Sequence, residues 1–131
     1  MRAVMLLSVM LLLALLGFMA PAHAQSREVT GQAGILGEWE LTATVTQRNT
    51  GGTKEFVGPL SLKHVGICTV DGPEEKKGEL RLRMSEMSTR VMGTLLIDGS
   101  ECTYNGDLKS LDNGIMSCPD RRSVPLVLSI K

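Results

Sequence analysis

The sequence predicts an all-β fold, in which seven or eight short strands form an antiparallel up-and-down meander that closes into a small barrel. Apolar and polar residues alternate in several short stretches, turn residues separate these stretches, and no stretch has a convincing helical period. Connections this short join antiparallel neighbours, and a meander of so many strands must hide its edges by closing on itself or by folding into two layers. A β-sandwich is therefore the alternative architecture.

The first 24 residues have the features of a secretory signal peptide. Arg2 supplies a positive charge, residues 4–19 form an apolar run, and Ala22-His23-Ala24 fits the small-x-small cleavage pattern. The run is shorter than the roughly 20 residues that a membrane-spanning helix needs. The sequence therefore predicts cleavage near Ala24, a periplasmic or secreted protein, and no membrane-spanning segment.

The chain that remains has the size of one domain. It has 107 of the 131 residues, with 13 basic and 14 acidic side chains, for a net charge of −1. A nucleic-acid partner is not expected at this charge, because phosphate binding requires a basic excess. Residues 25–35 follow neither period and are interpreted as a flexible N-terminal segment, which leaves 36–131 for the barrel domain.

The elements follow in order along residues 36–131. Trp39, Leu41, Ala43 and Val45 alternate with polar residues in the first strand, and the glycines at 51–52 turn the chain. Residues 54–57 form a short strand that Gly58-Pro59 is expected to break, and the alternation then resumes with a bulge between Lys63 and Gly66. Residues 71–78 are interpreted as an exposed loop. Further strands are expected around residues 80–84, 90–97, 100–108, 115–118 and 124–130.

The cysteines suggest one disulfide. A two-residue turn at Asp98-Gly99 pairs Leu95 with Cys102, and a second hairpin around residues 108–112 places Cys102 opposite Cys118. Closing this loop stabilises the fold by about 3 kcal/mol in chain-entropy terms. Cys68 is then a possible free thiol. The alternatives are three reduced core cysteines, or a Cys68 that pairs between molecules or stays reactive.

Neither catalysis nor metal binding is predicted. His64, the only histidine after cleavage, has no accompanying nucleophile motif. The cysteines and His64 lack the close spacing of a zinc site, and the acidic turns at 71–75 and 98–101 lack the spacing of a calcium loop. No cofactor is expected either. Lys63, Lys76, Lys77, Arg81 and Arg83 could form a basic stripe, but with so few aromatic residues they are interpreted as a charged outer face.

Gly37-Glu38-Trp39 at the start of the first strand resembles the Gly-x-Trp opening of the calycin-type barrels, which include lipocalins, avidin-like proteins and small periplasmic inhibitors of metalloproteases. This resemblance implies that Trp39 plugs one end of the barrel core. The inhibitor family is the closest in size, and is similar in its signal peptide, disulfide and free N-terminal segment. In that family the mobile N-terminus enters the protease cleft, a role that only residues 25–31 could take here.

The expected function is that of an exported, non-enzymatic binding module, an inhibitor or interaction scaffold for an unidentified protein partner. The alternative is a carrier of a small apolar ligand in a barrel cavity. An enzyme ranks last, because the chain has few suitable titratable groups.

Overall fold

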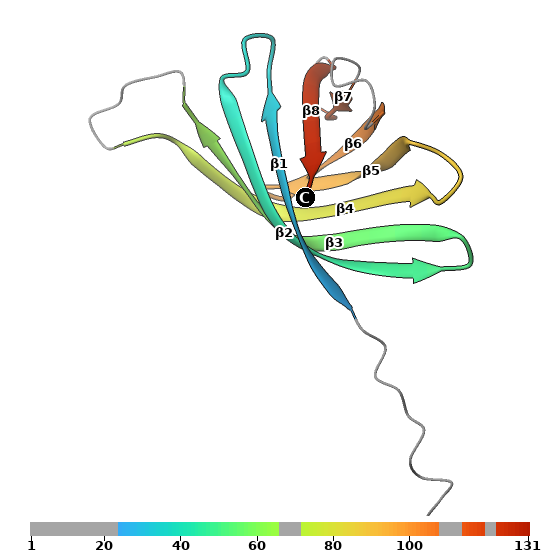
Figure 1. Ribbon diagram of the computed structural model, residues 1–131. Coiled ribbons are helices and arrows are strands. Elements are labelled where there is room, and N and C mark those ends of the chain that lie inside the picture. Colours follow the sequence, from blue (N-terminus) through green and yellow to red (C-terminus); the bar gives the residue numbers. More distant parts are fainter. Residues whose placement is uncertain (1–23, 66–71, 108–113, 120–122) are drawn as a thin grey trace, which may run out of the picture.

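The protein is an eight-stranded antiparallel barrel. A computed structural model describes residues 24–65, 72–107, 114–119 and 123–131. The strands are β1 (Gln25–Ala33), β2 (Trp39–Thr50), β3 (Thr53–His64), β4 (Glu75–Ser85), β5 (Arg90–Ile97), β6 (Ser100–Asp107), β7 (Ile115–Ser117) and β8 (Val124–Ile130). Each strand pairs with the next along the chain, and β8 pairs with β1 (Figure 1). The predicted closed meander is therefore confirmed.

Strand alternation builds the core. In β2, Leu41, Ala43 and Val45 are buried, whereas the residues between them are exposed. The same period of two recurs in β4, β5 and β6, since successive side chains point to opposite faces of a sheet. The buried side chains of the described residues are all apolar or weakly polar: Val29, Ala33, Leu41, Ala43, Val45, Phe56, Leu60, Leu62, Leu80, Leu82, Val91, Leu95, Cys102, Tyr104, Met116, Leu126 and Leu128.

Two tight turns have the backbone that their residues favour. Gly51 and Gly52 have φ values of 55° and 81°, and Asp98 and Gly99 have values of 47° and 83°. Two consecutive positive φ angles are typical of the type I′ turn, which suits the twist of a hairpin. The second turn pairs Ile97 with Ser100, and this confirms the register predicted for β5 and β6.

The prediction of a flexible segment at residues 25–35 is wrong, because most of this segment is strand β1. Gln25–Ala33 pairs with β2 along its whole length, and Val29–Ala33 also pairs with β8. Only Val29 and Ala33 are buried in β1, so its alternation is weak. Between them, a Cβ on Gly31 would lie 2.4 Å from the Val127 carbonyl oxygen, so the lack of a side chain permits the close approach of β8.

The expected break at Gly58-Pro59 does not occur either. Strand β3 is continuous, and β2 and β3 keep one register on both sides of this dipeptide. A Cβ on Gly58 would lie 2.0 Å from the Thr44 carbonyl oxygen. The two strands thus approach closely where Gly58 faces the barrel interior, and glycine is needed for packing rather than for a turn. The bulge expected between Lys63 and Gly66 lies partly outside the described residues.

Strand β4 begins inside the segment that was expected to be a loop. Glu75 to Gly78 already pair with β3, so the loop interpretation of 71–78 is wrong for this part. The charged side chains made this part of the strand resemble a loop in the sequence. In the structure, Glu75 and Lys77 are exposed residues of β4. At the inward position of Gly78, a Cβ would lie 1.6 Å from the Leu96 carbonyl oxygen, and β5 packs there.

The meander order defines two ends of the barrel. The β1–β2, β3–β4, β5–β6 and β7–β8 connections lie at one end, which we call the Trp39 end. The β2–β3, β4–β5 and β6–β7 connections lie at the opposite end, with the first residue of β1 and the last of β8. Among the residues that the structure describes, no helix is long and apolar enough to span a membrane.

Candidate functional site

A cavity of about 240 Å³ lies at the Trp39 end. Its apolar lining includes Trp39, Leu62, Ile97, Met116, Val124 and the cysteines of the disulfide. Its polar lining comes from Glu38, Lys76, Asp98 and Ser100. All eight strands contribute, because inward-facing residues of neighbouring strands converge where the barrel opens. An apolar pocket with a few polar groups at its edge is the usual form of a binding site.

Trp39 stands at the edge of this cavity, half-buried and packed against the core. Its ring stacks on His64 with a centroid separation of 4.5 Å, since the first residue of β2 pairs with the last residue of β3. The Lys76 Nζ lies 5.2 Å from the Trp39 ring centroid, within the range of a cation–π contact. Trp39 therefore lies at one end of the barrel beside the cavity, and its role as a plug of the core stays a prediction.

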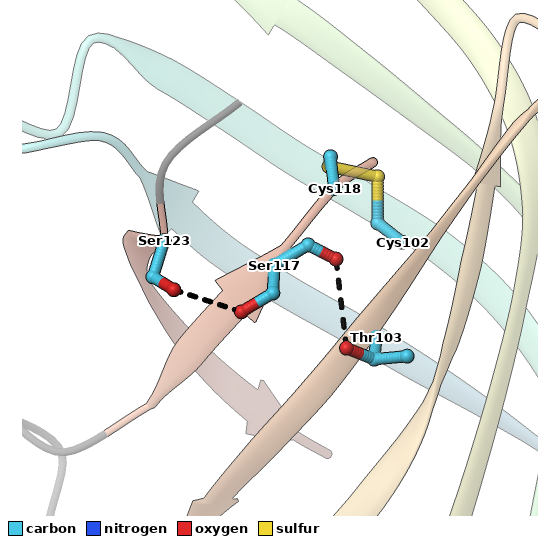
Figure 2. Close-up of a disulfide and its surroundings, with 5 residues drawn as sticks. All are labelled: Cys102, Thr103, Ser117, Cys118 and Ser123. Atoms are coloured by element: carbon cyan, nitrogen blue, oxygen red, sulfur yellow. Dashed lines mark hydrogen bonds between the residues drawn. A yellow bond between two sulfur atoms is a disulfide. The ribbon is translucent and has the colours of Figure 1, made fainter. Parts of the chain in front are cut away.

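A disulfide forms one wall of the cavity. Cys102 of β6 and Cys118, directly after β7, are bonded with a Cα–Cα distance of 4.2 Å, as predicted. Cys102 is buried and Cys118 is half-buried. On the outer face, the Thr103 hydroxyl donates to the Ser117 carbonyl oxygen at 3.5 Å, and the Ser117 and Ser123 hydroxyls lie 2.9 Å apart (Figure 2). These contacts hold the short strand β7 beside β6 and next to the start of β8.

The β1–β2 turn beside the cavity exposes two large aliphatic side chains. Ile35 is 85% exposed and Leu36 is 91% exposed. Gly34 and Glu38 of the same turn line the cavity, so the turn that carries the two side chains borders it. Ile35 was expected in the flexible segment and Leu36 at the start of the barrel, and neither was predicted as a site residue. The signal was present as two consecutive bulky aliphatic residues between Gly34 and Gly37.

Several hydrogen bonds hold this turn in place. The Gly34 amide donates to the Pro125 carbonyl oxygen at 2.9 Å, and the Gly37 amide donates to the Gly34 carbonyl oxygen at 3.2 Å. The Leu36 amide donates to Glu38 Oε2 at 3.0 Å. Gly34 and Gly37 have φ values of 98° and 65°, which side-chain-bearing residues rarely adopt. The turn is thus anchored to β8 and braced by its own carboxylate.

His64 contacts Trp39 by stacking, and the described residues contain no group of three or more His, Cys, Asp or Glu side chains placed to hold a metal ion. Asp98 belongs to the β5–β6 turn. Cys68 and Asp71 lie outside the described residues, so the free-thiol prediction stays a prediction.

The basic residues do not form one stripe. Lys76 faces the cavity, whereas the other four alternate to the outer face. Arg81 pairs with Glu79 at 2.6 Å, and this contact raises the pKa of the Arg81 guanidinium. Arg83 contacts Glu55 at 3.5 Å. These pairs are exposed and stabilise the fold only slightly.

A larger hollow of about 840 Å³ lies on the outer face of β3 to β7. Exposed Val57, Met92 and Ile115 contribute apolar surface, but they stand among the ion-paired arginines and a row of hydroxyl side chains. The cavity at the Trp39 end is more enclosed than this hollow, so the Trp39 end is the stronger candidate.

No protein-family model, curated protein or solved structure matched the chain.

Proposed function

We propose that the protein is an exported, non-enzymatic protein that binds a protein partner at the Trp39 end. The observation that carries this proposal is the pair of exposed aliphatic side chains, Ile35 and Leu36, beside an apolar cavity of about 240 Å³. Single exposed apolar residues are ordinary on protein surfaces, but two adjacent ones in a turn that borders a pocket indicate an interaction site.

The arrangement suits an anchor-and-rim mode of binding. A partner side chain would enter the cavity against Trp39 and Leu62, while the partner's backbone covers Ile35 and Leu36. Interfaces of this kind derive most of their affinity from a few large buried side chains. The hydrogen bonds that hold the β1–β2 turn reduce the conformational entropy lost on binding, because the turn is ordered beforehand.

The calycin-type barrels are a useful comparison for this proposal. They share the closed antiparallel meander, and an eight-stranded barrel is wide enough for its own side chains or for one small ligand. The inhibitor-type mechanism is not proposed, because residues 25–31 belong to the barrel wall and are not a free tail. Loops on a rigid scaffold would make the contact instead.

Export is proposed on two grounds. Residues 1–24 have the pattern of a signal peptide, and the expected cleavage point directly precedes Gln25, the first residue of β1. The Cys102–Cys118 disulfide is compatible with an oxidising compartment such as the periplasm or the outside of the cell.

A small apolar ligand is the second candidate occupant, and the cavity itself favours it. Pockets that enclose drug-sized molecules have volumes of roughly 300–1,000 Å³. At about 240 Å³, this cavity is suited to a smaller molecule or to a single side chain.

The test uses the neutral apolar dye Nile red and the fluorescence of Trp39, the only tryptophan of the chain. We expect the dye to bind the wild-type chain, and Leu36→Ser to weaken this binding about tenfold, since burial of one leucine contributes roughly 1.5–3 kcal/mol. Met87→Ser is the matched control, because Met87 is 96% exposed in the β4–β5 connection at the opposite end.

Equal dye binding by wild type and Leu36→Ser would contradict the proposed site. Hexanol provides the second arm of the experiment. If hexanol shifts the Trp39 emission and raises the melting temperature equally in both chains, the small-ligand candidate is favoured over the protein partner.

A further inference from the structure

We infer that the occupant of the Trp39 end is a basic segment of a partner protein, with an apolar side chain at its centre that enters the cavity. This inference rests on the proposed function and adds the chemistry of the partner. It is carried by the charge of the barrel end, which is independent of the apolar surface.

The charges of the barrel separate by end. We counted the described residues of the connections and the three terminal residues of each strand at each end. At the Trp39 end the acidic residues are Glu38, Glu40, Glu74, Glu75, Asp98 and Glu101, and the basic residues are Lys63, Lys76 and Lys77. Six acids and three bases give this end a net charge of −3.

The opposite end has the reverse balance by the same definition. Its basic residues are Arg27, Arg48, Lys54, Arg83, Arg90 and Lys131, and its acidic residues are Glu55, Glu86 and Asp107. Its described residues therefore have a net charge of +3. The described residues are therefore bipolar, and a partner that approaches the Trp39 end meets a negative field.

The acidic side chains stand where a partner would pass. Glu38 and Asp98 line the cavity, and Glu74 is exposed in the β3–β4 connection. The cation among the lining residues, Lys76, has its Nζ 5.2 Å from the centroid of the Trp39 ring. On the outer face, Lys63 lies between Glu40 and Glu75 in one cross-strand row. Complementary charge at the edge of an apolar contact raises the association rate and excludes partners of the wrong charge.

The extent of the surface favours a protein segment over a small amine or a membrane. A molecule that fits a cavity of about 240 Å³ would leave Ile35 and Leu36 in water, whereas a peptide segment can cover both. An anionic lipid surface would attract the opposite, basic end and be repelled by the Trp39 end. A basic peptide segment with one apolar anchor satisfies both the apolar and the charged parts of the site.

The probes are three synthetic peptides without tryptophan or tyrosine: a central leucine flanked by lysines, the same leucine flanked by glutamates, and a central alanine flanked by lysines. Binding is followed by Trp39 fluorescence at low and high salt. We expect the lysine–leucine peptide to bind at least about tenfold more tightly than either of the others, with an affinity that falls as salt increases.

The variants separate charge from apolar contact. Asp98→Asn removes a charge without disturbing the turn, because asparagine tolerates the positive φ of 47° and is favoured in type I′ turns. Combined with Glu74→Gln, it should weaken the lysine–leucine peptide about fivefold. Glu86→Gln at the opposite end is the matched control and should leave the affinity unchanged. Leu36→Ser should weaken binding of the lysine–leucine peptide by removing the apolar contact.

Four outcomes would overturn the inference. The first three are equal or tighter binding of the glutamate peptide, an unchanged affinity in the double variant, and no binding of any peptide. The fourth is that the chain binds anionic lipid vesicles more tightly than neutral ones and that Leu36→Ser weakens this vesicle binding. If peptide charge has no effect while Leu36→Ser still weakens Nile red binding, the inference fails and the proposed function stands. If Leu36→Ser has no effect on the dye, the proposed function fails as well.

Discussion

Tyr104 shows how single residues shape the interior of this barrel. Its ring is buried, and a Cβ on Gly106 would lie 2.1 Å from its hydroxyl oxygen. A Cβ on Gly114 would lie 2.8 Å from the same atom. Two glycines therefore make room for one aromatic side chain. The burial of the phenol raises the pKa of Tyr104 above its ordinary value of 10.0, because the charged phenolate is poorly solvated there.

This raised pKa predicts a loss of stability at alkaline pH. Below about pH 10 the phenol is neutral in both the folded and the unfolded chain, and the contribution to stability is complete. As the pH rises further, the unfolded chain loses the proton first, so the free energy of unfolding falls until the folded pKa is passed. Absorbance of the only tyrosine, with and without urea, should give a higher pKa for the folded chain.

Tyr104→Phe is the control for this prediction, because it keeps the ring and removes the titration. The free energy of unfolding of this variant should fall less steeply above about pH 10 than that of the wild-type chain. Equal pH dependence of the two proteins would contradict the assignment of the effect to Tyr104.

Among the elements, β7 depends most on its disulfide. It has three residues, of which three pair with β6 and two pair with β8. By comparison, β3 and β4 pair along eleven residues. A strand with so few ladder hydrogen bonds is poorly held by its backbone alone, and the bond between Cys102 and Cys118 compensates by joining β6 to the end of β7.

Removing this disulfide should lower the free energy of unfolding by about 3 kcal/mol, since the bond closes a loop with a sequence separation of 16. The comparison is between Cys102→Ala/Cys118→Ala and the wild-type chain in urea. Cys68→Ala serves as the control and leaves the bridge intact. A loss of stability in the control as large as that in the double variant would mean that Cys68 contributes equally.

Elements with strong alternation were predictable, and elements marked by glycine or charge were not. The β5–β6 hairpin follows from Asp98-Gly99, because two residues alone determine its turn and register. Gly58 and Gly78 were misread as a strand break and part of a loop. Both in fact face the interior where a neighbouring backbone approaches closely, and this is a long-range contact that no local pattern reports.

At the scale of the whole molecule, β1 closes the barrel. It joins β2 to β8 and so removes the two edges that an open meander would expose. Its role is not visible in residues 25–35, which have few apolar side chains. The strand is held mainly by backbone hydrogen bonds to its two neighbours.

Deletion of residues 25–31 should therefore destabilise the whole fold, whereas a free N-terminal tail could be removed without effect. We expect this deletion to lose the cooperative urea transition that Trp39 fluorescence reports. Deletion of residues 25–28 alone is the control and should be milder, because β8 pairs with β1 only from Val29 onward. An unchanged midpoint after removal of 25–31 would show that β1 is dispensable.

The sequence alone determined the local features of this protein: the strand alternation, the tight hairpins, the disulfide register and the resemblance that pointed to Trp39. These depend on side-chain period and turn chemistry over a few residues. Only the tertiary structure decided that β1 belongs to the wall, that Lys76 lies against Trp39, and that Ile35 and Leu36 stand beside a cavity. Each of these is a contact or exposure set by residues distant in the chain, which barrel closure brings together.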